Sequence, residues 1–298
     1  TQHLFSGLDA PICFTGNSFS MYTRNGSSNN LMIFLQGGGF CGPNACDAVE
    51  TGLPFLSFGI LNPNDASNPV ADWNVGYVPY CDGSGMMGDR EVDSDGDGVN
   101  DRFFRGAKNL SASLDVIART YPAPDKIVLA GNSAGGFAVH AALALVHKLY
   151  PNTPIDVIND SGLGILDPGG MEELIEYWGA ESFFPESCSN CIGADGNITD
   201  YHKYQLEQDT IIRLSYVGSK QDETFAQMIG AANYESQVLE AASEMNTAFP
   251  ERFNCIIANG NQHTFLIREF EYSIVGTNVK NWVSEMVKED DSWVSIIE

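Results

Sequence analysis

The sequence predicts an α/β fold whose mostly parallel central sheet has helices on both faces. From residue 126 onward, short apolar segments alternate with helical patterns, the order of a parallel sheet with crossover helices. The 298 residues are 43% hydrophobic and only 18% charged, enough for a sizeable core. The length allows two domains, but a single α/β domain of this size is common, and we expect residues 1–298 to form one domain. Residues 162–208 carry little strand pattern, and we interpret them as a cap-like insertion over the top of the sheet.

The elements follow in order along the chain. Ser18–Arg24 and Leu31–Gln36 are expected to pair as a hairpin around residues 25–30, and Val75–Tyr80 is a further strand. Residues 108–121 have the apolar spacing of an amphipathic helix. The later strands are Lys126–Ala130, Ile155–Asn159, Ile211–Val217 and Phe253–Ala258, and the later helices are Ala134–Leu149, Asp222–Ile229, Gln237–Phe249 and Val279–Lys288.

The charge balance excludes several classes of partner. Thirty-nine acidic residues against fifteen basic ones give a formal net charge of -24, which repels nucleic acid and anionic bilayers. The longest apolar run, around Phe137–Val146, is too short to span a membrane. The chain does not open on a signal peptide, so we expect any export signal to have been removed or never to have been there. Nothing in the sequence indicates an obligate protein partner.

Seven cysteines are many for a cytosolic enzyme of this size, and the odd number leaves at least one unpaired. Cys41 with Cys46, and Cys188 with Cys191, could each close a short bridge. Cys255 lies in an apolar run and is interpreted as a buried free thiol. We therefore expect an exported protein, extracellular or periplasmic, with about three disulfides.

A candidate nucleophile lies in Gly131–Gly135, which fits G-x-S-x-G between an expected strand and an expected helix. The reaction needs a serine on a tight strand-to-helix turn that only small neighbours allow, with the helix N-terminus facing the developing oxyanion. The alternative interpretation is a helix start with small residues for packing. The context favours Ser133 as a nucleophile.

A serine nucleophile needs a base, and the chain offers His3, His140, His147, His202 and His263. His140 and His147 lie on the helix behind Ser133 and are interpreted as core-edge or surface histidines. His263 follows the last expected strand, at the same end of the sheet as Ser133, and is therefore the candidate base.

The acid should lie between Ser133 and His263, because α/β-hydrolases use the order Ser, Asp/Glu, His. Asp160 and Asp222 each follow an expected strand in this interval. The usual position favours Asp222, Asp160 stays open as the alternative, and Glu223 is a weaker third candidate.

Three glycines after an early strand, in Leu35–Phe40, supply the other half of the predicted machinery. They let backbone N–H groups turn into the site, where they would join the N–H of Ala134 in an oxyanion hole. A phosphate-binding loop is not indicated, because no G-K-[ST] ending follows.

The ordered motifs resemble the pectin acetylesterase/Notum family of serine hydrolases. Leu35–Cys41 resembles its L-E-G-G-G-W-C segment, and Gly131–Gly136 its G-x-S-A-G-G segment. The remaining matches are Tyr80–Ser84 with Gly88-Asp89, Phe104–Gly106, and Ser215-Tyr216 with Asp222 and Gln227. We expect a bacterial-type member of this family, in which an acidic, calcium-loop-like segment, residues 93–101, is inserted between two of these motifs.

The resemblance implies an α/β-hydrolase-like fold, ester hydrolysis and no catalytic cofactor. In such a fold the insertion at residues 162–208 would lie over the active-site end. Carried over by motif, the triad is Ser133, Asp222 and His263, and the oxyanion donors are Gly39, Phe40 and Ala134. Phe40 replaces the family Trp, Gln36 replaces its Glu, and Thr264 stands where a Cys usually follows the histidine.

The expected function is therefore a secreted carboxylic ester hydrolase that works through an acyl-enzyme. Pectin is a polyanion that this acidic chain would repel, so we expect an uncharged ester: an acetylated neutral glycan, a short acyl ester or an aliphatic polyester. The alternative is a catalytically inactive calcium-binding or adhesion module on a hydrolase fold.

Residues 93–101 predict a structural calcium ion. Hard cations take oxygen ligands from alternating positions of a tight loop. The expected ligands are Asp93, Asp95, Asp97, the carbonyl of Val99 and Asp101. The alternative is a solvated acidic turn.

Overall fold

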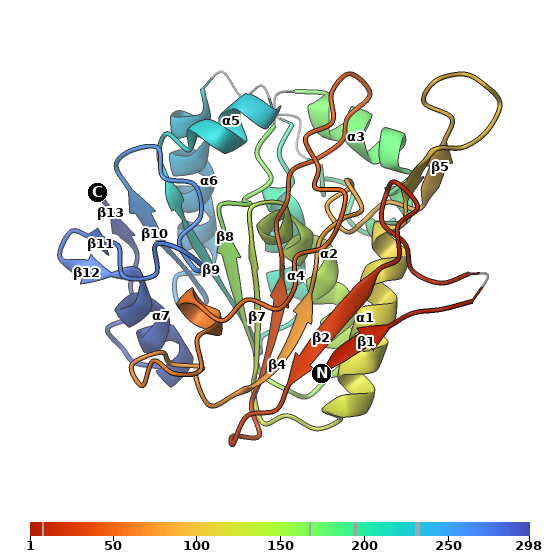
Figure 1. Ribbon diagram of the computed structural model, residues 1–298. Helices are drawn as coiled ribbons and strands as arrows, with labels where there is room; N and C mark the ends of the chain where they lie inside the picture. Colours follow the sequence, from red (N-terminus) through yellow and green to blue (C-terminus); the bar gives the residue numbers. More distant parts are fainter. Residues whose placement is uncertain (8, 167, 193–195, 230–232) are drawn as a thin grey trace.

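A computed structural model describes residues 1–7, 9–166, 168–192, 196–229 and 233–298. In these residues the main sheet has nine strands in the order β1-β2-β4-β3-β7-β8-β9-β10-β13 (Figure 1). Only the pairs β1–β2 and β2–β4 among them are antiparallel. The strands are β1 (Gln2–Leu4), β2 (Ser20–Arg24), β3 (Leu31–Leu35), β4 (Asn74–Val78), β7 (Ile127–Asn132), β8 (Ile155–Asp160), β9 (Ile212–Ser219), β10 (Phe253–Ala258) and β13 (Ile296–Ile297). The expectation of a mostly parallel α/β sheet is confirmed.

Two apolar clusters cover the two faces of this sheet. Alternation along β3 sends Leu31, Ile33 and Leu35 into one cluster and Met32 and Phe34 into the other. The first cluster includes side chains of α1 (Gly106–Thr120), α2 (Ala134–Leu149), α4 (Thr199–Gln208) and α6 (Tyr234–Ala248). The second includes those of α7 (Val279–Lys288) and the short helix η1 (Gly59–Leu61). Helices therefore lie on both faces, as expected.

The predicted hairpin between the first two long strands is wrong. β2 and β3 do not pair with one another, because β4 lies between them and pairs antiparallel with β2 and parallel with β3. All five residues of β3 are buried, so this apolar strand needs a neighbour on each side. The Asn74 side chain secures the arrangement: it accepts from the Gly26 N–H at 3.1 Å and donates to the carbonyl of Ser28 at 3.0 Å.

The stretch 162–208 divides between two places. The helix α3 (Gly170–Trp178) lies near the end of the sheet toward which the arrowheads of β4, β8 and β10 point (Figure 1). The helix α5 (Glu223–Ile229) lies at the same end. By contrast, α4 contacts α2 and α6 on one face of the sheet, so that only part of the stretch lies over its top. The short helix η2 (Glu181–Phe183) lies between α3 and α4 along the chain.

Two small hairpins complete the description. The strands β5 (Arg90–Val92) and β6 (Arg102–Phe104) pair antiparallel and carry the acidic residues 93–101 between them. The strands β11 (Ser273–Ile274) and β12 (Thr277–Asn278) form the second hairpin, before α7. Sequence patterning did not predict these very short strands.

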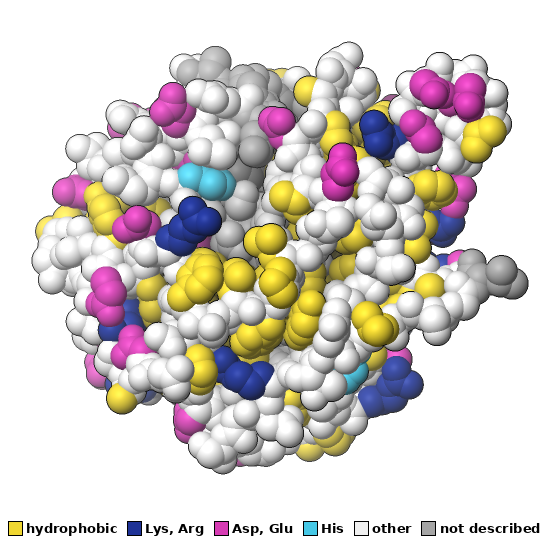
Figure 2. All heavy atoms as spheres, viewed as in Figure 1, with side chains coloured by type: hydrophobic (Ala, Val, Ile, Leu, Met, Phe, Trp, Pro, Cys, Tyr) yellow, Lys and Arg dark blue, Asp and Glu magenta, His cyan; other side chains and the backbone are white. Residues whose placement is uncertain are grey.

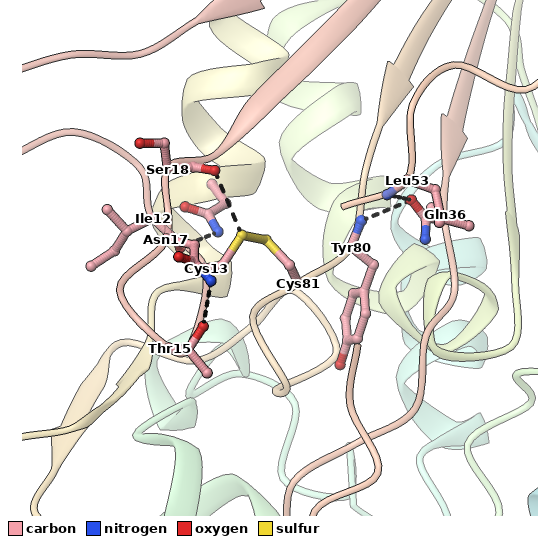
Figure 3. Close-up of a disulfide and its surroundings, with 10 residues drawn as sticks. Ile12, Cys13, Thr15, Asn17, Ser18, Gln36, Leu53, Tyr80 and Cys81 are labelled. Atoms are coloured by element: carbon pink, nitrogen blue, oxygen red, sulfur yellow. Dashed lines mark hydrogen bonds between the residues drawn. A yellow bond between two sulfur atoms is a disulfide. The ribbon is translucent and has the colours of Figure 1, made fainter. Parts of the chain in front are cut away.

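Three disulfides are present, and all seven cysteines lie among the described residues. Cys41–Cys46 and Cys188–Cys191 are the two short bridges expected from spacing, and Cys255 is a buried free thiol. The third bridge, Cys13–Cys81, joins residues 68 positions apart and was not predicted. Figure 3 shows it beside Tyr80, where it ties the amino-terminal segment to the loop after β4.

Candidate active site

Ser133 lies in the tight turn between β7 and α2. Its backbone has φ 56° and ψ -124°, a conformation that costs energy for a residue with a side chain and that the surroundings must enforce. The Ser133 N–H donates to the carbonyl of Asp160 at 2.8 Å, and its carbonyl accepts from the Phe137 N–H at 2.9 Å. Its side chain therefore projects from the end of the sheet while the backbone is held on both sides.

His263 joins Ser133 to Asp222 in one chain of hydrogen bonds. The Ser133 Oγ lies 2.9 Å from His263 Nε2, and His263 Nδ1 lies 2.8 and 2.9 Å from the two carboxylate oxygens of Asp222. A carboxylate only accepts, so this geometry assigns the imidazole proton to Nδ1 and leaves Nε2 to accept from the serine hydroxyl. Asp222 is fully buried at the junction of β9 and α5.

Asp160, the alternative acid, has a different set of partners. Its carboxylate accepts from the backbone N–H groups of Phe265 at 2.9 Å and Leu266 at 2.8 Å. It thus fixes the loop just after His263 without a hydrogen bond to the imidazole in the described contacts. Complete burial raises the pKa of Asp160 to about 7, against the opposing effect of those N–H donors.

The glycine loop packs directly against the serine turn. A Cβ on Gly37 would lie 2.2 Å from the carbonyl oxygen of Asn132 and 2.7 Å from the Cβ of Ser133, so only glycine fits there. Gly39 has φ +80°, which also favours glycine. Gly39 and Phe40 belong to this loop, and Ala134 is the first residue of α2 directly after Ser133.

Two amide side chains hold the peptide groups at the start of this loop. The Gly37 N–H donates to Asn132 Oδ1 at 3.2 Å, and the Gly37 carbonyl accepts from Gln36 Nε2 at 3.1 Å. Gln36 Oε1 accepts from the N–H groups of Leu53 at 3.1 Å and Tyr80 at 3.4 Å (Figure 3), and from the Tyr77 hydroxyl at 3.2 Å. Gln36 is buried, so these contacts replace water. The sequence alone did not single out Gln36 or Asn132 for this task.

An aromatic cluster packs around Phe40 of the glycine loop. The ring of Phe40 lies 5.2 Å from that of Phe137 on α2 and 5.6 Å from that of Trp178 at the end of α3. Trp178 Nε1 donates to the carbonyl of Cys41 at 2.6 Å, and the Cys41 N–H donates to Gly83 at 2.8 Å. The helices α2 and α3 and the loop after β4 therefore all support the glycine loop.

The Tyr80–Ser84 motif supplies that last support. Asp82 is buried, and its carboxylate accepts from the N–H groups of Ser84 at 2.9 Å and Met86 at 3.1 Å. Burial raises the pKa of Asp82 above its usual range, while these donors oppose the shift. The contacts give Asp82 a role in shaping the loop around Gly83.

Two cavities, here called grooves, are lined by residues of the segments that carry Asp222 and His263. A cavity of about 460 Å³ is lined by Asp47, Glu223, Thr224, Gln227 and Asn261. A larger one of about 1120 Å³ shares three of these residues and extends along α5 and α6. The smaller cavity lies between the loop that follows Phe40 and the segments that carry Asp222 and His263.

The remaining histidines lie away from the serine. His140 and His202 are both fully buried, with ring centroids 3.6 Å apart and nearly parallel planes. His140 is therefore a core residue and not at the core edge or surface. Burial lowers the pKa of His202 to about 4 and places that of His140 well below its usual value. His3 bonds Thr23 Oγ1 at 2.8 Å near the amino terminus. His147 contacts Asp209 at 2.6 Å.

In the acidic loop the predicted ligands separate into two groups. Carboxylate oxygens of Asp93, Asp95 and Asp97 lie within 4.8 Å of one another. Asp101 instead accepts from the N–H of Ser94 at 2.8 Å and its hydroxyl at 2.7 Å. The backbone N–H groups of Gly96 and Gly98 already donate to Asp93. The calcium ion stays a prediction.

Comparison with known proteins places the chain in a family. The structure of the Wnt deacylase Notum from Drosophila has a TM-score of 0.74 to this chain at 18% identity, covering 100% of this chain and 95% of that one. The fold is thus of the α/β-hydrolase type. A family model described as Pectinacetylesterase matches residues 8–169, more than half of the chain. The chain belongs to the pectinacetylesterase family.

Individual relatives match only part of this chain. Pectin acetylesterase 11 from Arabidopsis thaliana is 27% identical over 209 residues, which is 62% of this chain and 53% of that protein. Palmitoleoyl-protein carboxylesterase notum2 from Xenopus laevis is 28% identical over 167 residues, 51% of this chain and 33% of that protein. The chain spans about half the length of the plant relatives that it matches. In the described residues no helix is long and apolar enough to cross a bilayer.

Proposed function

We propose that this protein is a secreted carboxylic ester hydrolase with Ser133 as nucleophile, His263 as general base and Asp222 as the acid of the triad. The observation that carries the proposal is the continuous chain of hydrogen bonds from Ser133 Oγ through the imidazole to a buried carboxylate. Family membership and the names of the relatives support the same reaction class.

In this mechanism His263 Nε2 takes the hydroxyl proton as Ser133 Oγ attacks the ester carbonyl. The tetrahedral intermediate collapses, His263 returns the proton to the leaving alcohol, and the acyl group stays on Ser133. A water molecule, activated by the same imidazole, then releases the carboxylic acid. Asp222 holds the imidazole in the tautomer with the proton on Nδ1 and stabilises the imidazolium that forms.

The backbone N–H groups of Gly39, Phe40 and Ala134 are the donors that we assign to the oxyanion. Ala134 opens a helix, so its N–H has no partner one turn earlier in α2 and lies at the positive end of the helix dipole. The support of the loop by Gln36, Asn132 and Trp178 would keep such donors in place before the substrate arrives, which is the condition for electrostatic stabilisation of the transition state.

The substrate that we propose is an uncharged acyl ester. The formal net charge of -24 opposes the approach of a polyanion such as pectin, although relatives carry pectin in their names. Three disulfides agree with an oxidising compartment and thus with secretion. No cofactor takes part in the proposed steps.

The test is the loss of esterase activity in Ser133→Ala and His263→Ala. Triad members act as a unit, so each variant should retain less than about one thousandth of wild-type turnover on 4-nitrophenyl acetate while keeping its melting temperature. A fluorophosphonate probe should label the wild type and not Ser133→Ala. A folded wild type that neither hydrolyses esters nor takes the probe would instead support the inactive calcium-binding or adhesion module.

A further inference from the structure

The smaller groove beside the triad is formed by the segments that carry the site. Asp47 belongs to the wall next to the glycine loop, because its N–H donates to the carbonyl of Phe40 at 2.9 Å. Glu223 directly follows Asp222, and Asn261 lies two residues before His263. A group bound in this cavity of about 460 Å³ would therefore lie beside the reacting ester.

The polar groups of this groove are carboxylates, amides and one hydroxyl. Glu223 is held in place by Gln227 Nε2, 3.1 Å from one of its oxygens, and by Asn261 Nδ2, 3.1 Å from the other. Neither Asp47 nor Glu223 forms an ion pair with a described residue. The negative charges of these two carboxylates are therefore presented to any ligand that enters the groove.

The adjoining larger groove continues the same chemistry. Its described lining includes the amides of Gln221 and Asn233 and a third carboxylate, Glu235, which accepts from Gln221 Nε2 at 3.1 Å. Lys220 is the single basic side chain among the described residues that line the two grooves. On the face shown in Figure 2, basic side chains are likewise scattered singly among acidic ones.

We propose that the smaller groove binds the alcohol part of the ester, and that this alcohol is an uncharged polyhydroxylated chain such as a neutral glycan. Asp47 and Glu223 would exclude alcohols that carry a uronate carboxylate. The inference rests on the proposed function and narrows its substrate. Amides donate hydrogen bonds to sugar hydroxyls and accept from them, and carboxylates accept from them, whereas an aliphatic polyester would bury these groups without partners. In the smaller groove a uronate carboxylate would meet the like charges of Asp47 and Glu223, with no basic side chain among the described residues that line it.

Three matched substrates test the exclusion. They are methyl O-acetyl-galactopyranoside, the corresponding O-acetyl-galacturonate, and the methyl ester of that galacturonate, which differ only at the C6 group. At low salt the wild type should hydrolyse the two neutral acetates with kcat/KM about tenfold above the charged one. This ratio should shrink in about 0.5 M salt, because screening weakens the repulsion.

The variants assign the effect to the two carboxylates. Glu223→Gln and Asp47→Asn should each raise kcat/KM for the galacturonate relative to the galactopyranoside about threefold, and the double variant should nearly abolish the preference. The control is Glu240→Gln, which makes the same change in net charge at an exposed position of α6 outside the groove. It should leave the ratio at its wild-type value.

Each result decides the inference. Equal rates on charged and neutral acetates by an active wild type, or a preference that Glu240→Gln removes as fully as Glu223→Gln, would overturn the exclusion and leave the esterase proposal standing. Faster hydrolysis of a polyester film than of every sugar acetate would overturn the glycan assignment. A wild type inactive on all of these and on 4-nitrophenyl acetate would overturn the proposed function together with the inference.

Discussion

The neighbouring strands β8 and β9 lead into two aspartates that are equally buried and differently used. Asp222, three residues beyond β9, faces the imidazole of His263, whereas Asp160, the last residue of β8, binds the backbone N–H groups of Phe265 and Leu266. One carboxylate therefore orients the candidate base, and the other shapes the loop that carries it. Burial and position at the end of a strand do not distinguish a triad acid from a structural carboxylate; the donors that face it do.

The largest expected difference between the two aspartates is in turnover. Asp222→Asn should lower kcat by about four orders of magnitude, because the amide leaves His263 in the wrong tautomer. Asp160→Asn should cost far less, within about tenfold, since its oxygen can still accept from the backbone. Steady-state kinetics on 4-nitrophenyl acetate decides, and the reverse ranking would move the acid to Asp160.

Gln36, the residue after β3, offers a test of how far the support of the glycine loop contributes to turnover. Gln36→Leu should lower kcat about tenfold to a hundredfold with little change in KM, because the Gly37 carbonyl loses its donor while the site keeps its groove. Gln36→Glu keeps the acceptor for Leu53, Tyr77 and Tyr80 and should recover the melting temperature lost in Gln36→Leu. A variant whose KM alone changes would show that Gln36 acts on substrate binding instead.

The pH dependence of stability separates Asp160 from the buried histidines. The pKa of Asp160 is raised to about 7, so the folded state holds a proton that the unfolded state has released, and its contribution falls as pH rises from about 4 to 7. The pKa of His202 is lowered to about 4, so its contribution falls in the opposite direction, as pH drops from about 6.5 to 4.

The two trends offset one another in the wild type, and each variant should expose one of them. Compared with the wild type, Asp160→Asn should make the free energy of unfolding increase more with pH between about 4 and 7. Over the same range, His202→Gln should make it increase less or decrease. Each change is on the order of 3 kcal/mol over the range. Urea titrations at several pH values measure it; parallel curves for the two variants would contradict the assignment.

The smallest expected effect concerns the acidic loop, residues 93–101, between β5 and β6. If Asp93, Asp95 and Asp97 hold calcium together with the Val99 carbonyl and Asp101, excess chelator should lower the melting temperature by a few degrees, because only the folded state binds the ion. Added calcium should restore it, and activity of the folded enzyme should change little. An unchanged melting curve with no metal by elemental analysis would refute the site.

Local sequence patterns allowed the central strands and helices and two candidate site residues, Ser133 and His263, to be predicted. Residues 131–135 indicate Ser133 through their own spacing, and the position of His263 after the last long strand follows from strand order. The insertion of β4 between β2 and β3 could not be predicted, because it depends on which strand buries the second edge of β3. Gln36 was seen only as a departure from a motif, since the donors to its Oε1 lie 17 to 44 residues away.

The contact between Trp178 and the glycine loop limits how this protein can be re-engineered. A covering segment that merely shields a site can be exchanged for another of suitable length, but α3 ends in a ring that packs on Phe40 and donates to the Cys41 carbonyl. A chimera that receives a foreign segment in place of residues 170–183 must also receive a matching residue 40. Modular exchange here therefore requires two distant pieces of sequence to be transferred together.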